Sequence, residues 1–334
     1  MLVAARQLVF WFLAYFTKIK FMNTAYSYDN IVLTPKYSEI KSRSKLDTSV
    51  EFLGKKFKSV AIPANMKCTI DFKKARELSE AGYFYVLHRF YDYYDIYDWV
   101  KDNQDLKTIS ISVGVNEKDW ELVNDLFANK LRVDYITIDV AHGHHILVKD
   151  MINHIKNHCF KHSAKIIAGN IGTIHAARDL GLWGADAVKV GLSMGKSCTT
   201  YNCTGVGTPM FSTVANLSYL NVPVIADGQI REVGDVCKAL VAGADMVMIG
   251  SEFAKCANSP AKTVGKKKEF YGSASSTNKG HNGYVEGKVV YLEMREESYK
   301  QYFDRINQGI QSCMSYAGID DITKLHLMEY SIYK

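Results

Sequence analysis

Short apolar segments recur along the chain at a spacing that leaves room for a helix between most neighbours. They are rich in Val, Ile and Tyr and hardly alternate with polar residues, which is typical of strands buried on both faces of a parallel sheet. Eight strands are predicted, at residues 59–63, 83–87, 108–113, 134–140, 164–168, 185–190, 222–226 and 244–249.

The intervening segments have helical periodicity, and glycines that stop helices follow several of them. Helices are predicted at residues 72–81, 118–128, 145–158, 174–182 and 232–242, with a terminal helix at 298–318. Eight strand–helix units in series favour an α/β fold of the TIM (β/α)8 barrel type over a doubly wound sheet.

Two segments fall outside this repeat. Residues 254–294 are long for a loop and rich in Gly, Ser, Lys and Asn, so we expect a flap-like insertion after strand 8. Residues 27–47 precede the first strand and are expected to cover the barrel floor or to reach a neighbouring molecule. A single TIM-barrel domain is therefore predicted over residues 22–334.

Residues 8–16 form an apolar run after Arg6 that resembles part of a signal peptide. The run is too short to span a bilayer, and lysines follow it instead of a small-residue cleavage site. An interfacial anchor, a targeting segment and an upstream extension before a start at Met22 are the three interpretations. We favour the extension and exclude residues 1–21 from the predicted fold. No other segment reads as membrane-spanning, so no membrane partner is expected.

Composition places the chain among ordinary globular proteins, with 334 residues of which 47% are hydrophobic. The net charge of +6 is modest, and Lys266-Lys267-Lys268 is interpreted as a solvated loop rather than a nucleic-acid interface. Seven cysteines without a Cys-x-x-Cys pair indicate a reducing, cytoplasmic location. Those expected to fill space in the interior are Cys68, Cys159, Cys237, Cys256 and Cys313.

In a TIM barrel the active site lies at the C-terminal ends of the strands. Loops seven and eight of such barrels often bind phosphate through backbone N–H groups, so Gly228 and Gly250 predict a phosphorylated ligand. The alternative is that these glycines only form tight turns. Arg89, at the end of the second strand, is interpreted as a carboxylate or phosphate ligand or as half of a structural ion pair.

Cys198 lies in a glycine-rich loop, residues 191–207, directly after the sixth predicted strand. Substrate can reach a thiol on such a loop, and nearby backbone N–H groups can lower its pKa. Cys198 is therefore the candidate nucleophile. The arrangement Asp139-x-x-His142-x-His144 resembles metal ligands, but no third ligand set follows at readable spacing, so hydrogen-bonding residues at a site rim are favoured.

Ordered motifs along the chain carry a resemblance to a known family. They include Lys41-Ser-Arg-Ser44, Pro63-Ala-Asn-Met66, Ile167-Ala-Gly-Asn170, Ser197-Cys-Thr-Thr200, Ile225-Ala-Asp-Gly228 and Val285-Glu-Gly-Lys288. From about residue 26 to the C-terminus the sequence resembles the IMP dehydrogenase/GMP reductase family, and within it the bacterial-type reductases. The resemblance implies a homotetrameric enzyme of purine nucleotide salvage that uses NADPH to convert GMP to IMP and ammonia.

By this resemblance, Cys198 attacks C2 of the purine and ammonia leaves, which gives a covalent thioimidate. A reduced nicotinamide then delivers hydride to C2, and IMP is released. Covalent capture divides one difficult step into two easier ones. Thr200 and Glu286 are the implied proton carriers, because a hydroxyl relayed to a carboxylate can protonate departing ammonia.

The same resemblance implies the binding residues. Asp227 is expected to hold the ribose hydroxyls. Substrate phosphate and base are expected at Gly228, Gln229, Gly250, Ser251, Gly272 and Ser273. The nicotinamide cofactor is expected at Ser42, Arg43, Arg89, Asp139, Val140 and Ala141. A monovalent cation, K⁺, is expected on backbone carbonyls of Ser193, Gly195 and Cys198.

The chain departs from the family pattern in three places. The loop before the cysteine normally reads Gly-Ile-Gly-Pro-Gly, whereas here it is Gly191-Leu-Ser-Met-Gly195. A positive φ at Ser193 would cost about 1–2 kcal/mol and bears on the cation site. Gln229 replaces a usual glycine and either crowds the phosphate or supplies an amide, and Tyr201 stands where a basic residue is common. We interpret the chain as a divergent, active enzyme.

Two alternatives compete with a reductase. An IMP dehydrogenase uses the same thioimidate but hydrolyses it, and it usually carries a regulatory domain pair after strand two and an Arg-Tyr pair in its flap. Too few residues separate His88 from Thr108 for that insertion, and residues 254–294 contain no Arg-Tyr dipeptide. The second alternative is a catalytically inactive nucleotide-binding barrel, suggested by the altered positions 193, 194 and 229.

Overall fold

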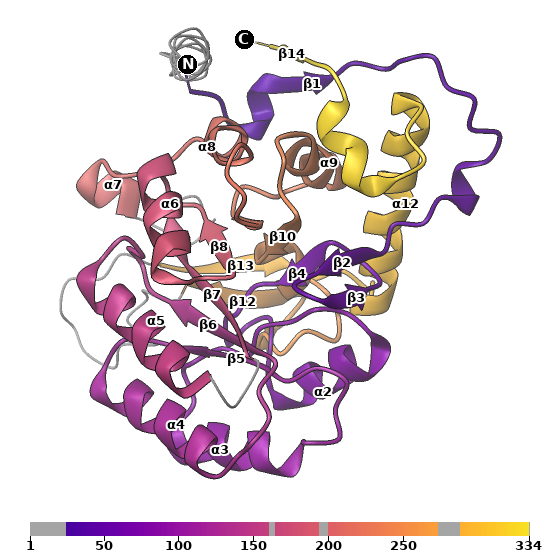
Figure 1. Ribbon diagram of the computed structural model, residues 1–334. Coiled ribbons are helices and arrows are strands. Elements are labelled where there is room, and N and C mark those ends of the chain that lie inside the picture. The colour runs from indigo at the N-terminus through magenta and orange to yellow at the C-terminus, as the bar shows by residue number, and fades with distance from the viewer. Residues whose placement is uncertain (1–24, 160–163, 194–199, 273–287, 334) are drawn as a thin grey trace, which may run out of the picture.

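A computed structural model describes residues 25–159, 164–193, 200–272 and 288–333. Its centre is a parallel sheet with strand order β4-β10-β9-β8-β7-β6-β5, which curls into the predicted TIM barrel (Figure 1). The strands are β4 (Ala61–Pro63), β5 (Ser110–Val113), β6 (Tyr135–Asp139), β7 (Lys165–Ile171), β8 (Ala187–Val190), β9 (Val224–Asp227) and β10 (Met246–Ile249). Seven of the eight predicted strands are therefore confirmed.

The second predicted strand, residues 83–87, is buried but is not a regular strand. Only Leu87 pairs with β5, through a bridge to Ile111. The carbonyl of Thr108 instead accepts hydrogen bonds from the hydroxyls of Tyr85 at 2.8 Å and Ser79 at 2.9 Å. Side-chain hydroxyls thus bond a carbonyl that would pair with a backbone N–H in a regular sheet. The prediction of a regular strand is therefore wrong here.

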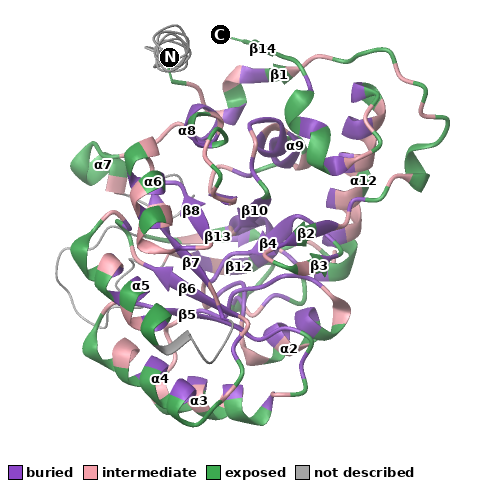
Figure 2. Ribbon diagram, viewed as in Figure 1, coloured by how far each residue is buried: buried purple, intermediate pink, exposed green. Residues whose placement is uncertain are grey.

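Helices follow the strands and surround the sheet, whose strands are almost wholly buried (Figure 2). They are α2 (Phe72–Ala81), α3 (Tyr93–Asp102), α4 (Glu117–Ala128), α5 (Ile146–Cys159), α6 (Ile174–Trp183), α8 (Met210–Leu217), α9 (Val233–Val241) and α12 (Tyr299–Ala317). Within the part of the chain that the structure describes, no helix is long and apolar enough to cross a membrane.

Capping residues fix the helix boundaries that the sequence predicts. The Ser298 hydroxyl accepts the N–H of Gln301 to begin α12, and Gly318, with a φ of 68°, ends it. Helices α3 and α8 are not among those predicted from the sequence. Helix α3 buries only Ile96 and Val100, so its apolar period is sparse. Helix α8 is buried over most of its length and lacks a polar face.

An antiparallel sheet stands where the flap-like insertion is predicted. It follows the short helix α10 (Ser251–Ala254) and contains β11 (Thr263–Val264), β12 (Lys267–Tyr271) and β13 (Val289–Glu293). Lys268 is buried in β12, where its ammonium donates to the carbonyls of Ser259 at 3.4 Å and Ala261 at 3.2 Å. The prediction of a solvated loop is therefore wrong in part: Lys266 lies in an exposed turn and Lys267 is exposed, but Lys267 and Lys268 belong to a strand and Lys268 is buried.

The barrel floor is covered by residues after the predicted segment. Strands β2 (Val50–Phe52) and β3 (Lys55–Phe57) form a hairpin whose Phe52 and Phe57 rings lie 5.5 Å and 5.1 Å from that of Phe84. Earlier in the chain, β1 (Ile31–Leu33) pairs antiparallel with β14 (Tyr330–Ile332). The remaining elements are the 3-10 helices η1 (Tyr28–Asn30), η2 (Arg43–Lys45) and η3 (Ile322–Leu327) and the helix α7 (Thr200–Thr204).

Four of the five cysteines expected to fill space, Cys68, Cys237, Cys256 and Cys313, have a described environment and are buried. Their prediction is confirmed. The exposed cysteine among those described is Cys203 on α7.

Candidate active site

Lys189 is the centre of a polar cluster at the C-terminal ends of the strands. It is the penultimate residue of β8, and only 3% of its side chain is exposed. Its ammonium lies 3.0 Å from the carboxylate of Asp139 and 2.8 Å from that of Asp227, and it donates a hydrogen bond to Oδ1 of Asn170. Since β6, β7, β8 and β9 are neighbours in the sheet, one cation joins four strand ends.

Charges in this cluster are balanced. Burial raises the pKa of the Asp139 carboxyl, but Lys189 and Arg89 outweigh burial and hold that pKa below its ordinary value. Burial alone would lower the pKa of Lys189, but Asp227 and Asp139 raise it above its ordinary value. Arg89 also donates from Nε to the backbone carbonyl of Asp139 at 3.0 Å. At neutral pH the cluster therefore contains an ionised Asp139 beside a protonated Lys189.

The bases of loops six and seven are in contact. The amide of Asn170 donates to Oδ2 of Asp227 at 3.0 Å and to the carbonyl of Gly191 at 2.8 Å. Gly191 has a φ of 141°, and a Cβ built on it would lie 2.0 Å from the carbonyl oxygen of Asp227. Only glycine fits this position, because any side chain would overlap the backbone of β9.

Loop six, which carries Cys198, is closed at its base. The N–H of Leu192 donates to Oγ1 of Thr208 at 3.0 Å, and the N–H of Thr208 donates to the carbonyl of Leu192 at 3.2 Å. Gly195 and Cys198 lie outside the described residues. Half-buried Thr200 begins α7. The structure thus places the start of the nucleophile loop, at Gly191, beside Asp227 and joins the loop's two ends through Leu192 and Thr208, without describing the thiol.

Loops seven and eight carry the predicted phosphate residues. Gly228, with a φ of 118°, follows Asp227, while Gly250 and Ser251 begin α10. The next residue, Glu252, is buried, but its carboxylate is paired with Lys255 at 2.6 Å and with Arg295. Its negative charge is therefore compensated. Gly272 follows β12, whereas Ser273 and Glu286 lie outside the described residues.

Ser193 and Gln229, two departures from the family glycines, have φ values of 65° and 58°. The positive φ suspected at Ser193 is therefore confirmed. The Ser193 hydroxyl is also buried and forms no hydrogen bond with any residue that the structure describes. Both features predict local strain at this position.

Replacing Ser193 with glycine is expected to stabilise the protein by about 1 kcal/mol. Glycine removes the free-energy cost of the left-handed backbone and of the buried hydroxyl, and this gain exceeds the cost of the greater conformational entropy of the unfolded chain. Urea unfolding measures the change. Ser315→Gly in α12 is the matched control and should destabilise, because that serine has helical backbone. A lower unfolding free energy for Ser193→Gly would contradict the strain.

The histidines near the cluster are engaged elsewhere. Burial lowers the pKa of His88 to about 3, so this ring is neutral, and its Nδ1 accepts the N–H of Phe90 at 3.1 Å. His144 pairs with Asp179 of α6 through a contact of 3.0 Å. Among the described residues, no three His, Cys, Asp or Glu side chains are grouped to hold a metal ion.

Two predicted cofactor residues lie apart from the cluster. Ser42 and Arg43 are exposed beside α12, where Arg43 donates to the hydroxyl of Ser312 at 2.7 Å. By contrast, Val140 and Ala141 directly follow Asp139 at the end of β6. The structure thus links Arg89 to Asp139, and Asp139 to Asp227 through Lys189. A role for Ser42 and Arg43 stays a prediction from the resemblance.

The model of the IMP dehydrogenase / GMP reductase domain matches residues 25–331. The chain belongs to this family. Named relatives include the GMP reductase of Oceanobacillus iheyensis, 43% identical over 94% of this chain and 97% of that protein. The GMP reductases of Acidovorax ebreus and Bacillus subtilis are 43% and 42% identical, over 92% and 94% of this chain and 95% and 97% of theirs.

Sequence reasoning missed Lys189, although a signal for it exists. This member of the IMP dehydrogenase/GMP reductase family carries the lysine inside the apolar run 185–190, which we assigned to a strand buried on both faces. A lysine in such a strand needs carboxylate partners, because an unpaired buried ammonium is unstable. Asp139 and Asp227, at the ends of other strands, were available as those partners.

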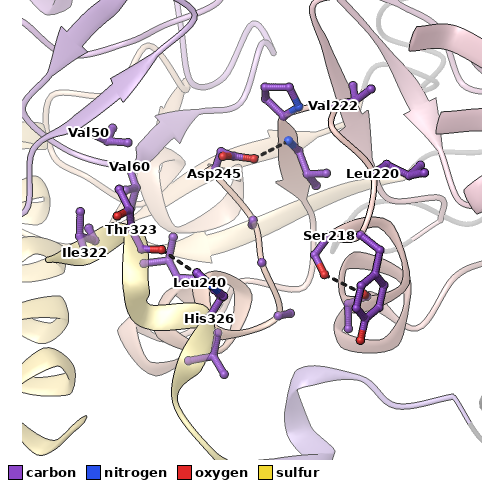
Figure 3. A pocket seen from close by; sticks show the side chains of 18 of the residues that line it. Val50, Val60, Ser218, Leu220, Val222, Leu240, Asp245, Ile322, Thr323 and His326 are labelled. Atoms are coloured by element: carbon purple, nitrogen blue, oxygen red, sulfur yellow. Dashed lines mark hydrogen bonds between the residues drawn. The ribbon is translucent and has the colours of Figure 1, made fainter. Parts of the chain in front are cut away.

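A cavity of about 710 Å³ lies at the opposite end of this family member's barrel (Figure 3). Three of its polar side chains are already bonded within the chain. Asp245 accepts the N–H of Val224 at 2.7 Å, Ser218 donates to the carbonyl of Ala215 at 2.9 Å, and Nδ1 of His326 contacts the carbonyl of Thr323 at 2.8 Å. No converging set of free polar groups is seen among these, so we place the candidate site at the other end.

Proposed function

We propose that this protein is a GMP reductase that uses NADPH to convert GMP to IMP and ammonia. Full-length similarity to proteins named GMP reductase supports the proposal. The observation that carries it is the contact between Gly191, at the base of the Cys198 loop, and Asp227, the candidate ribose ligand. This contact joins the nucleophile loop to the nucleotide site.

Asp227 is well suited to bind the ribose hydroxyls. Lys189 and Asn170 both contact its Oδ2, while Oδ1 forms no hydrogen bond with the residues that the structure describes. Because the Asp227 side chain is 22% exposed, this oxygen can accept an O–H group. The backbone N–H groups of Gly228, Gly250 and Ser251 would bind the phosphate at the neighbouring strand ends.

The chemistry then needs a nucleophile and a proton carrier. The thiolate of Cys198 would attack C2 of the purine, and the C2–N2 bond breaks as ammonia leaves. Thr200, assisted by Glu286, would supply the proton that ammonia takes. When bound, a reduced nicotinamide supplies the hydride that C2 requires. The bond between C2 and the Cys198 sulfur then breaks, which releases IMP and regenerates the thiolate.

The residues at the end of β6 fit a polar group of the dinucleotide. The Arg89 side chain is 27% exposed, and beyond its Nε contacts with Asp139 its guanidinium forms no hydrogen bond in the described part of the chain. Those free N–H groups, with Asp139, Val140 and Ala141, would hold the cofactor. The roles of Ser42 and Arg43, the K⁺ ion on Ser193, Gly195 and Cys198, and the homotetramer follow from the family resemblance. The cytoplasmic location follows from the cysteine pattern.

An IMP dehydrogenase is the second candidate, since it would use the same nucleophile. The structure favours a reductase because α3 (Tyr93–Asp102) follows the irregular second strand directly, at the place where a regulatory domain pair would be inserted. An inactive nucleotide-binding barrel is the third candidate, based on the strained Ser193 and Gln229.

One assay separates the three candidates. GMP with NADPH should lower the absorbance of the reduced cofactor, and K⁺ should accelerate the reaction. IMP with NAD⁺ should give no increase in absorbance. An increase would indicate a dehydrogenase, whereas GMP binding without turnover by NADPH or NADH would indicate an inactive barrel.

A further inference from the structure

The ammonium of Lys189 is shared by two carboxylates that we assign to different ligands. Asp227 belongs to the nucleotide side of the site and Asp139 to the cofactor side, and the ammonium lies within 3.0 Å of both. Their contacting oxygens are therefore no more than about 6 Å apart. Without a cation, two carboxylates this close cannot both ionise freely, and they titrate as a pair.

Few other charges face this pair. Arg89, from the end of the second strand, lies 3.9 Å from the carboxylate of Asp139. Asn170 of β7 is neutral and donates to Asp227. Within the described ranges, Lys189 is the one cation that forms an ion pair with Asp227. Arg89 thus compensates only the cofactor side, and the nucleotide side depends on Lys189.

We propose that Lys189 is a positioning residue that keeps Asp227 ionised and oriented for the ribose hydroxyls and couples it to Asp139 on the cofactor side. The proposal rests on the proposed function for the identity of the nucleotide. Lys189 itself need not touch either ligand, since its three N–H donors point at Asp139, Asp227 and Asn170.

The test is the pH dependence of GMP binding, measured by calorimetry without cofactor from about pH 5.5 to 8.5. Wild type should bind with nearly constant affinity over this range. Lys189→Met should bind GMP about tenfold or more weakly at the acidic end of the range and regain affinity as pH rises. Without the lysine, Asp139 and Asp227 share a proton at low pH, and this proton must leave before Asp227 can accept O–H groups.

Two further variants separate positioning from a general loss of structure. Lys189→Arg retains the charge and should keep affinity independent of pH. The double variant Lys189→Met, Asp139→Asn leaves Asp227 without a carboxylate neighbour, so its affinity for GMP should also be independent of pH. Because the double variant removes one buried negative charge together with the buried positive charge, it should still fold. Lys165→Met, which breaks a Lys165–Asp186 pair of 3.0 Å at the start of β7, is the matched control and should bind like wild type.

Kinetics provide a second readout. Lys189→Met should raise the KM values for GMP and NADPH together, whereas Asp139→Asn should raise mainly that for NADPH. Wild-type affinity for Lys189→Met at every pH, or failure of the double variant to remove the pH dependence, would overturn the inference about Lys189 and leave the proposed function unaffected. A wild-type protein that turns over no GMP would overturn the proposed function, whatever Lys189→Met does to binding.

Discussion

Replacing Cys198 with alanine is expected to lower kcat for GMP reduction by about 10⁴-fold or more while GMP binding changes little. The thiolate is the only group proposed to form a bond with C2, so its loss leaves the amine to depart from an intact aromatic purine. Binding should persist because Asp227, Gly228 and Gly250 are the proposed ligands of the ribose and phosphate and would not contact C2. Steady-state kinetics and calorimetry with GMP measure the two effects.

Cys203→Ala is the matched control, because Cys203 is an exposed cysteine on α7, five positions along the same loop. It should retain wild-type turnover. Mass spectrometry of acid-quenched wild type with GMP should show the protein plus GMP minus ammonia, and Cys198→Ala should show no adduct. Turnover by Cys198→Ala near the wild-type rate would refute covalent catalysis by this residue.

Gly191→Ala is expected to destabilise the fold by about 3 kcal/mol or more and to abolish GMP binding. The new Cβ would lie 2.0 Å from the carbonyl oxygen of Asp227, and the φ of 141° disfavours any L side chain. The ends of β8 and β9 must therefore separate, which moves Asp227 away from Lys189. Urea unfolding and calorimetry with GMP check both results.

Gly234→Ala is the control for Gly191→Ala. Gly234 lies near the start of α9, and no atom lies within 4 Å of the Cβ built on it. Alanine there should stabilise the helix by about 0.5–1 kcal/mol. If Gly191→Ala unfolded at the same urea concentration as wild type, the close approach of β8 and β9 would be wrong.

The fold was largely predictable because burial on both faces gives continuous apolar strands and because capping residues mark helix ends. The terminal helix predicted at 298–318 begins and ends with the caps that define α12. The failure at residues 83–87 has a local cause. Their apolar character correctly predicts burial. The Thr108 carbonyl, however, accepts hydrogen bonds from the hydroxyls of Ser79 and Tyr85 instead of a strand N–H, and no sequence pattern predicts this exchange of hydrogen-bond partners.

Candidate site residues were predictable where their position at the end of a single strand was enough to identify them. Arg89, Asp139 and Asp227 were singled out from their positions after strands, and the structure brings them together. Lys189 was missed because its importance depends on two partners that lie about 40 or more residues away in the chain. The strain at Ser193 is not predictable from the sequence, because a dihedral angle cannot be read from residue type alone.

The pairing of β1 with β14 has a consequence for biosynthesis. Residues 31–33 find their partner strand only in residues 330–332, far along the chain. At about 5–20 residues per second, the ribosome needs roughly 15–60 s to make the intervening chain. During that time the nascent polypeptide exposes an unpaired strand edge, and the two-stranded ribbon can form only after residues 330–332 have been translated.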